Sequence, residues 1–169
     1  RLSLVGSEMC IRDRDILAGE VSVTIDNQTD LCVTYATTDG WELVETHLWV
    51  GESLADMPQT KKGNPQIGQF PYVSGDITGE TTWSVCIPLT EFGDPDSLCD
   101  VTLYLASHAA LRKLIGEDEY QTETGWGDGT RLVDRGSWAT YFTITLMCDG
   151  WPAVDEDCET AFALSLIHI

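Results

Sequence analysis

Apolar and polar residues alternate with a period of two along most of the chain, and this pattern predicts β-strands. The predicted strands are residues 21–26, 31–37, 42–50, 81–89, 101–111 and 138–147. Polar turns separate neighbouring strands, so we expect antiparallel pairing. The pattern therefore predicts an all-β fold, an antiparallel β-sandwich of about six to eight strands with long loops and little helix. A barrel is the alternative.

The alternation also assigns a face to each side chain, because successive residues of a strand point to opposite sides of the sheet. The face of the 42–50 strand that we expect to point inward consists of Val44, Thr46, Leu48 and Val50. On this assignment His47 and Trp49 point outward.

Two stretches break the alternating pattern. Residues 51–80 are rich in Pro, Gly, Asn and Gln, and we expect a long loop held in place by Phe70 and Tyr72. Residues 116–130 are acidic and Gly-rich, and we expect a second loop there. The segment 107–115 could form a short helix instead of the end of a strand.

The charge of the chain limits its partners. Its 169 residues include 28 Asp and Glu against 9 Lys and Arg, a net charge of −19. Such a surface repels phosphate groups, which argues against nucleic acid and anionic membranes as partners. No apolar run reaches the roughly 18 residues of a membrane-spanning helix, so we expect no membrane insertion. The charge permits divalent cations and basic partners.

The two ends of the chain differ from the rest. The opening RLSLVGSEMCIRDR and the closing LSLIHI resemble translated sequencing-adapter DNA. We therefore expect residues 1–14 and 164–169 to be non-native. Residues 15–147 would form the β-sandwich module, and 148–163 an acidic linker with the start of a truncated next domain. A natural basic helix at 1–14 is the alternative.

Five cysteines lie between these ends, and their spacing matches no zinc site. Disulfides in an oxidising compartment are the better interpretation. Because Cys86 ends one predicted strand and Cys99 precedes the next, we expect a Cys86–Cys99 bridge. Cys148 and Cys158 could close a short acidic loop. Cys32 lies within a strand pattern and is expected to be a small buried residue.

Four stretches together resemble an uncharacterised extracellular β-sandwich module of large secreted or surface-displayed proteins from environmental microbes. They are residues 33–51, 56–72, 101–111 and 124–142. The resemblance implies an extracellular, β-rich unit that has other domains of the same parent chain as neighbours. Residues 158–163 resemble the start of a module that follows it. The resemblance implies no particular activity.

Calcium is the cofactor that the acidic loops suggest, because this hard cation prefers several oxygen ligands on a flexible loop. The candidate ligands are Glu117, Asp118, Glu119 and Asp128. Their spacing does not match an EF-hand. A solvated acidic loop without an ion is the alternative.

Aromatic side chains at loops or on outward faces are the candidate ligand-binding residues, because they offer a flat apolar surface to a sugar ring or a protein partner. They are Trp41, Trp49, Tyr120 and Trp126. Alternatively, they pack loops onto the sandwich. Trp83 and Trp138 are expected in the core or as caps. Arg131 and Arg135 are expected to form structural ion pairs.

These features favour a non-enzymatic, extracellular module that is structural, adhesive or ligand-binding within a larger secreted or cell-surface protein. A carbohydrate-binding module that uses exposed Trp is the alternative, and a hydrolase domain is the third reading. No G-x-S-x-G motif is present. Glu45 and His47 lie in a regular strand pattern, so we expect a structural role rather than acid–base catalysis.

Overall fold

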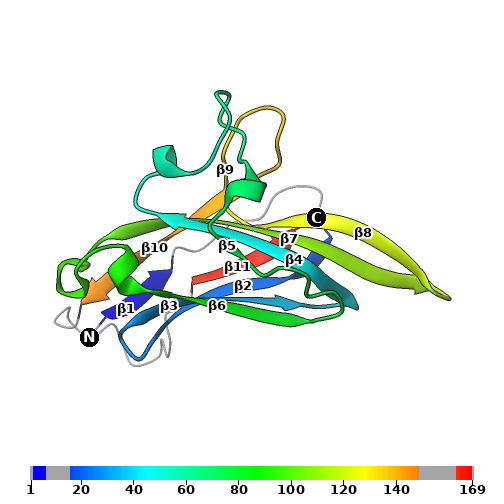
Figure 1. Ribbon diagram of the computed structural model, residues 1–169, viewed down its shortest axis with the longest axis horizontal. Helices are drawn as coiled ribbons and strands as arrows, with labels where there is room; N and C mark the ends of the chain where they lie inside the picture. Colours follow the sequence, from blue (N-terminus) through cyan, green and yellow to red (C-terminus); the bar gives the residue numbers. More distant parts are fainter. Residues whose placement is uncertain (1, 7–15, 149–162, 169) are drawn as a thin grey trace.

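The alternating runs form strands in the computed structural model, which describes residues 2–6, 16–148 and 163–168. The predicted all-β fold is confirmed: two antiparallel layers face each other as in a sandwich (Figure 1). The first layer contains β2 (Leu17–Asp26), β3 (Asp30–Thr37), β6 (Thr82–Pro88) and β11 (Ala163–His168). The second contains β1 (Leu2–Gly6), β4 (Trp41–Gly51), β5 (Tyr72–Val73), β7 (Thr102–Gly116), β8 (Glu119–Gly127), β9 (Thr130–Arg131) and β10 (Thr140–Cys148).

The long strand β7 organises the second layer. On one side it pairs with β4 along that strand's length, and on the other it pairs first with β10 and then with β8. The end of β8 also pairs with β11, which links the two layers at one edge. Short 3-10 helices interrupt the loops: η1 (Leu54–Asp56), η2 (Ile67–Gln69), η3 (Leu89–Glu91) and η4 (Pro95–Ser97).

The main core lies between the two layers and is formed by the predicted apolar faces. It contains Val21 and Val23 of β2 together with Phe142, Ile144 and Leu146 of β10. Ile87 of β6 is fully buried, and Trp83 and Val85 on the same face pack against the core. In each of these strands the alternate apolar residues face the core, as the period-two pattern predicts, because burial of one apolar face fixes the register of the strand.

The face assignment for β4 is only half correct, because the strand contains a β-bulge. The register with β7 shifts between Leu43 and Glu45, so Val44 is the extra residue. Trp41 and Leu43 before the bulge, and Leu48 and Val50 after it, all belong to the main core. A bulge places an additional residue on one strand and reverses the alternation of faces beyond it. Period-two counting cannot detect this reversal.

The acidic segment after β7 is a strand rather than a loop, and the helical alternative for 107–115 is also wrong. β7 extends to Gly116, and β8 returns antiparallel from Glu119 through a two-residue turn. Asp118 in this turn has a φ of 55°, a conformation that Asp tolerates better than most residues. Tyr and Thr at alternate positions suit a strand, so cross-strand pairing overrides the loop-like acidic composition.

The segment between β4 and β5 is a loop, as predicted, and it packs on the outer face of the second layer. Phe70 is buried there, and Met57 is buried beside it. Tyr72 contacts the main core instead. The loop therefore forms a second apolar cluster, on the side of the sheet opposite the main core.

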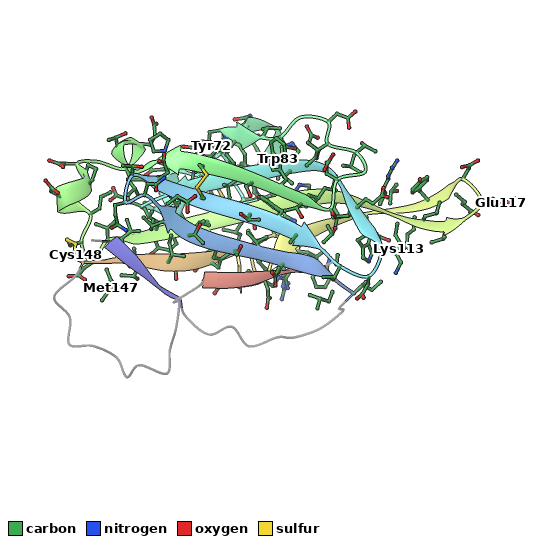
Figure 2. All side chains as sticks on the ribbon, turned by 90° about the horizontal axis from the view of Figure 1, so that it is seen from below. Tyr72, Trp83, Lys113, Glu117, Met147 and Cys148 are labelled. Carbon is green, nitrogen blue, oxygen red and sulfur yellow. A yellow bond between two sulfur atoms is a disulfide. The ribbon has the colours of Figure 1, made fainter. Side chains whose placement is uncertain are left out.

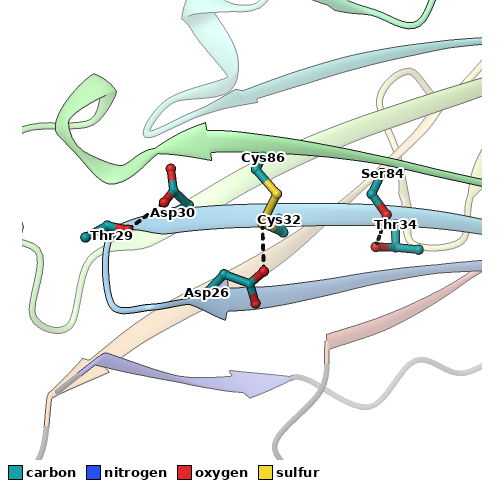
Figure 3. The surroundings of a disulfide bond; sticks show 7 residues. All are labelled: Asp26, Thr29, Asp30, Cys32, Thr34, Ser84 and Cys86. Carbon is teal, nitrogen blue, oxygen red and sulfur yellow. Dashed lines mark hydrogen bonds between the residues drawn. A yellow bond between two sulfur atoms is a disulfide. The ribbon is translucent and has the colours of Figure 1, made fainter.

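Two disulfides link the strands, and they differ from the predicted pairs. Cys32 of β3 lies directly opposite Cys86 of β6 and is bonded to it, with 4.0 Å between the Cα atoms (Figure 3). Cys99 is bonded to Cys148 at the end of β10, with 5.3 Å between the Cα atoms. The expected Cys86–Cys99 bridge is wrong, because sheet register rather than sequence distance decides which cysteines meet. Cys158 lies outside the described residues.

The adapter-like ends contribute strands to the sheet. β1 pairs with β10 over residues 2–6, and β11 pairs with β2 over residues 163–168. Their foreign origin stays a prediction. The proposed linker between 148 and 163 falls almost entirely outside the described residues.

Candidate functional site

Two loops rise together above the second layer and form what we call the loop crest, residues 58–66 and 128–139 (Figure 1). They touch each other: a Cβ atom added at Gly63 would lie 3.2 Å from Cγ1 of Val133. The crest therefore combines segments that are about 70 residues apart in the sequence.

The first crest loop is a tight hairpin. Gln59 and Pro65 form a bridge at its base. At its apex the Gly63 amide donates to the Thr60 carbonyl over 2.9 Å, which closes a turn around Lys61 and Lys62. Gly63 has a φ of 83°, where a residue with a side chain would be strained. The turn thus presents both lysine side chains to solvent.

The second crest loop is closed by strand pairing and carries an exposed tryptophan. β9 pairs with the start of β10, and the Leu132 amide donates to the Ala139 carbonyl over 3.0 Å. Arg131 donates from Nη2 to the Ser137 carbonyl over 3.0 Å, and its guanidinium lies over the Trp138 ring, 5.0 Å from the centroid. Trp138 is 67% exposed.

The second apolar cluster anchors both crest loops to the sheet, so we call it the anchor cluster. Its buried members are Trp49, Met57, Phe70 and Ala106, with Leu54, Ile67, Tyr104, Trp126 and Leu132 packed against them. Met57 and Ile67 stand immediately before and after the first loop, and Leu132 lies within the second. Burial of Met57 and Phe70 contributes about 1.5–3 kcal/mol each to the stability of the fold, which holds the crest on a rigid base.

The crest is the cationic part of an acidic molecule. Residues 16–148 contain six Lys and Arg, and four of them lie in the crest: Lys61, Lys62, Arg131 and Arg135. Only two carboxylates, Asp128 and Asp134, belong to the same loops. Lys61, Lys62 and Arg135 form no ion pair with any residue that the structure describes. The remaining two cations are engaged elsewhere, Arg112 with Glu42 at 2.7 Å and Lys113 over the ring of Trp41.

The predicted roles of the two arginines are thus partly wrong. Arg131 does stabilise its loop, but through the Ser137 carbonyl and the Trp138 ring rather than through an ion pair. Arg135 is exposed.

Two of the four predicted ligand-binding aromatics are buried, so their expected outward exposure is wrong. Trp41 is 2% exposed in the main core, and Trp49 is 5% exposed beneath the loop between β4 and β5. Trp126 is half-buried, with its ring against Phe70 and His108. Tyr120 is exposed, and Arg112 lies 4.2 Å from its ring centroid.

Trp138 was expected in the core or as a cap, and the structure places it at the surface. β10 begins two residues later, at Thr140, so Trp138 is outside the alternating segment. The sequence offers one signal for this position, since Gly136 and Ser137 precede it and both favour irregular backbone.

The four acids suggested for calcium do not converge. Glu117, Asp118 and Glu119 occupy the projecting end of the β7–β8 hairpin, where Figure 2 labels Glu117. Asp128 follows the other end of β8, nine residues from Glu119 along the strand, or about 30 Å away. Asp128 therefore cannot share an ion with the hairpin acids. Calcium binding by the hairpin acids alone stays a prediction.

Among the described residues, one group brings three potential ligand atoms within 4.8 Å of one another: Asp26, Cys32 and Cys86 (Figure 3). The two sulfurs are joined in a disulfide and offer no thiolate to a metal. A disulfide sulfur carries no proton, so the 3.5 Å contact between Cys32 Sγ and Asp26 Oδ2 is not a hydrogen bond. The group is a structural bridge with an adjacent carboxylate.

Two histidines lie opposite each other on the outer face, beside the anchor cluster. The rings of His47 on β4 and His108 on β7 have centroids 5.6 Å apart, and Glu45 Oε2 is 3.7 Å from His47 Nε2. Both Nδ1 atoms are buried without a hydrogen-bond partner. Burial, with a smaller contribution from His47, lowers the pKa of His108 to about 4. His108 is therefore neutral at physiological pH and contributes no positive charge to the surface.

Another feature of the outer face is an open hollow of about 370 Å³, lined by Val44, Ala110, Leu111, Thr122, Glu123 and Thr124. It is shallow, and neither His47 nor His108 lines it.

Comparisons with known proteins return no match: no family model, no curated protein and no solved structure is similar to this chain. In the part of the chain that the structure describes, no helix has the length and apolar character needed to cross a lipid bilayer.

Proposed function

We propose that this chain is a non-enzymatic binding or adhesion module of a larger secreted or cell-surface protein, and that the loop crest is its contact surface. The observation that carries the proposal is Trp138, a large apolar side chain held in the open by Arg131 on a firmly anchored loop. Exposed aromatic side chains on rigid supports are typical contact residues for ligands and partners.

The disulfides of the scaffold support an extracellular location, and its charge and loops suit a binding module. The two disulfides are of the kind that forms in oxidising compartments. The large excess of acids keeps a protein soluble and prevents self-association through like-charge repulsion. Sandwich folds also commonly place binding residues on loops over a rigid sheet, as the crest does here.

Carbohydrate recognition is the second candidate. The residue that favours it is Trp138, rather than the aromatic residues that the sequence suggested. A sugar ring stacks on an exposed indole through its apolar face. Trp41 and Trp49 are buried and cannot offer such a face.

The test measures binding of the full chain to immobilised polysaccharides, both neutral and acidic, and to immobilised extracellular proteins. We expect at least one surface to retain the chain, and Trp138→Ala to weaken that binding about tenfold. Tyr120→Ala, which removes an exposed aromatic from the far hairpin, is the matched control and should bind normally. Equal binding by both variants and the native chain would contradict the crest as contact surface.

A further inference from the structure

We infer that the ligand of the loop crest is an acidic polysaccharide, a chain of sugar rings that carry carboxylate or sulfate groups. The inference rests on the proposed function, because it names the ligand class for the same surface. Its basis is the coincidence, on two touching loops, of an exposed indole and four cations in a molecule whose net charge is −19.

The cations of the crest are available to a ligand. Lys61 and Lys62 stand at the apex of a hydrogen-bonded turn, and Arg135 is exposed on the facing loop. The chain has 28 acids with which these three basic side chains could pair. These three find none among the described residues, so their charge can act on an external anion.

Trp138 offers an apolar stacking surface, which a simple anion such as phosphate would not use. The Arg131 guanidinium lies over the indole and helps fix its orientation. A planar ring has two faces, and the 67% exposure of Trp138 leaves most of its surface open to a ligand. An indole beside cations is suited to a ligand that is both ring-shaped and negatively charged.

A polysaccharide fits this surface better than an acidic protein. The crest projects from a body that carries the excess of carboxylates (Figure 1). A broad acidic protein would bring its own charge close to that body, and like charges repel over the Debye length of about 8 Å at physiological salt. A narrow sugar chain can contact the crest and avoid the body.

The experiment uses two pairs of polymers; the members of each pair share a sugar backbone, and only one of them carries anionic groups. Polygalacturonate is compared with its methyl ester, and dextran sulfate with dextran, so the two arms separate carboxylate from sulfate recognition. We expect the full chain to bind at least one anionic polymer and to bind its neutral counterpart at least about tenfold more weakly. Raising the salt concentration should weaken the binding.

Three variants locate the interaction. The double variant Lys61→Gln and Lys62→Gln should lose about tenfold in affinity, and Asp134→Asn should gain affinity because it removes a competing carboxylate. Lys113→Gln removes one cation on the β7–β8 hairpin, outside the crest, and should bind normally (Figure 2). All affected side chains are exposed or partly exposed, so folding should be preserved, which circular dichroism checks.

Several results would overturn the inference: equal binding of the charged and neutral polymers, equal losses in the Lys61/Lys62 and Lys113 variants, or no binding to any polymer. Equally tight binding of polyglutamate would indicate an acidic protein partner instead. If a neutral polysaccharide binds and Trp138→Ala abolishes that binding, the inference fails but the proposed function stands.

Discussion

His108 shows how a single buried residue links burial to pH. It lies between His47 and Trp126, its Nδ1 has no partner, and burial holds its pKa at about 4, below the ordinary 6.5. The unfolded chain therefore binds a proton at His108 in a pH range where the folded protein does not. Acid shifts the equilibrium toward the unfolded chain.

We therefore expect stability to be complete above the ordinary pKa of histidine and to decline as the pH falls from 6.5 toward 4. As the pH is lowered from about 7.5 to about 5, protonation of His108 in the unfolded chain should lower the free energy of unfolding by about 2 kcal/mol. Urea titrations of the native chain and of His108→Leu measure this, and the variant should show the smaller pH dependence. Equal slopes for the two proteins would exclude His108 as the cause.

The tryptophans show how much of a residue's role the sequence can predict. Trp83 follows the alternating pattern of its strand and packs on the core as expected. Trp41 and Trp49 are both buried, because the alternating pattern shows neither the bulge in their strand nor the packing of the following loop over it. Trp138 stands just outside a strand and is exposed. Residue type sets the interaction that a side chain can make, whereas neighbours distant in sequence decide whether it is accessible.

At the scale of elements, the two disulfides join strands that are remote in sequence. Cys32 and Cys86 connect neighbouring strands β3 and β6 across 54 residues, and Cys99 and Cys148 are separated by 49. Each bridge restricts the unfolded chain, and loops of these similar lengths should give similar stabilisation.

We expect removal of either bridge by paired Cys→Ala substitution to lower the free energy of unfolding by about 4 kcal/mol. Chemical denaturation without reductant measures the loss. Peptide mapping of the unreduced protein should recover a Cys32–Cys86 and a Cys99–Cys148 peptide. Recovery of a Cys86–Cys99 peptide would disprove the pairing described above.

Strand β8 is the longest strand that sequence reasoning missed, and its pairing explains why. Acidic residues and glycines at 116–130 are typical of loops when considered alone. β7 supplies an unpaired edge and a two-residue turn, so the backbone groups of β8 gain hydrogen-bond partners by extending antiparallel to it. The candidate calcium ligands were consequently separated by the length of a strand.

For the whole molecule, the dominant long-range force is repulsion among carboxylates. The net charge of −19 is spread over the folded surface, where acids lie closer together than in the expanded unfolded chain. Screening of this repulsion by salt should favour the folded state.

We expect the melting temperature to rise by roughly a few degrees as sodium chloride increases from about 0.05 M to about 0.5 M, and to level off when screening is complete. Scanning calorimetry at neutral pH measures the change, and potassium chloride should act equally if screening is the cause. A melting temperature that stays constant or falls would show that carboxylate repulsion does not limit stability.

The sequence by itself determined the all-β class, most of the strands, the inward faces of regular strands and the acidic surface. These properties depend on local alternation and on composition, which are readable along the chain. Only the tertiary structure decided the disulfide partners, the reversal of faces in β4, and the loop crest. Each of these requires residues far apart in the sequence to meet, as Gly63 and Val133 do, and their meeting is set by sheet register and by burial of the anchor cluster.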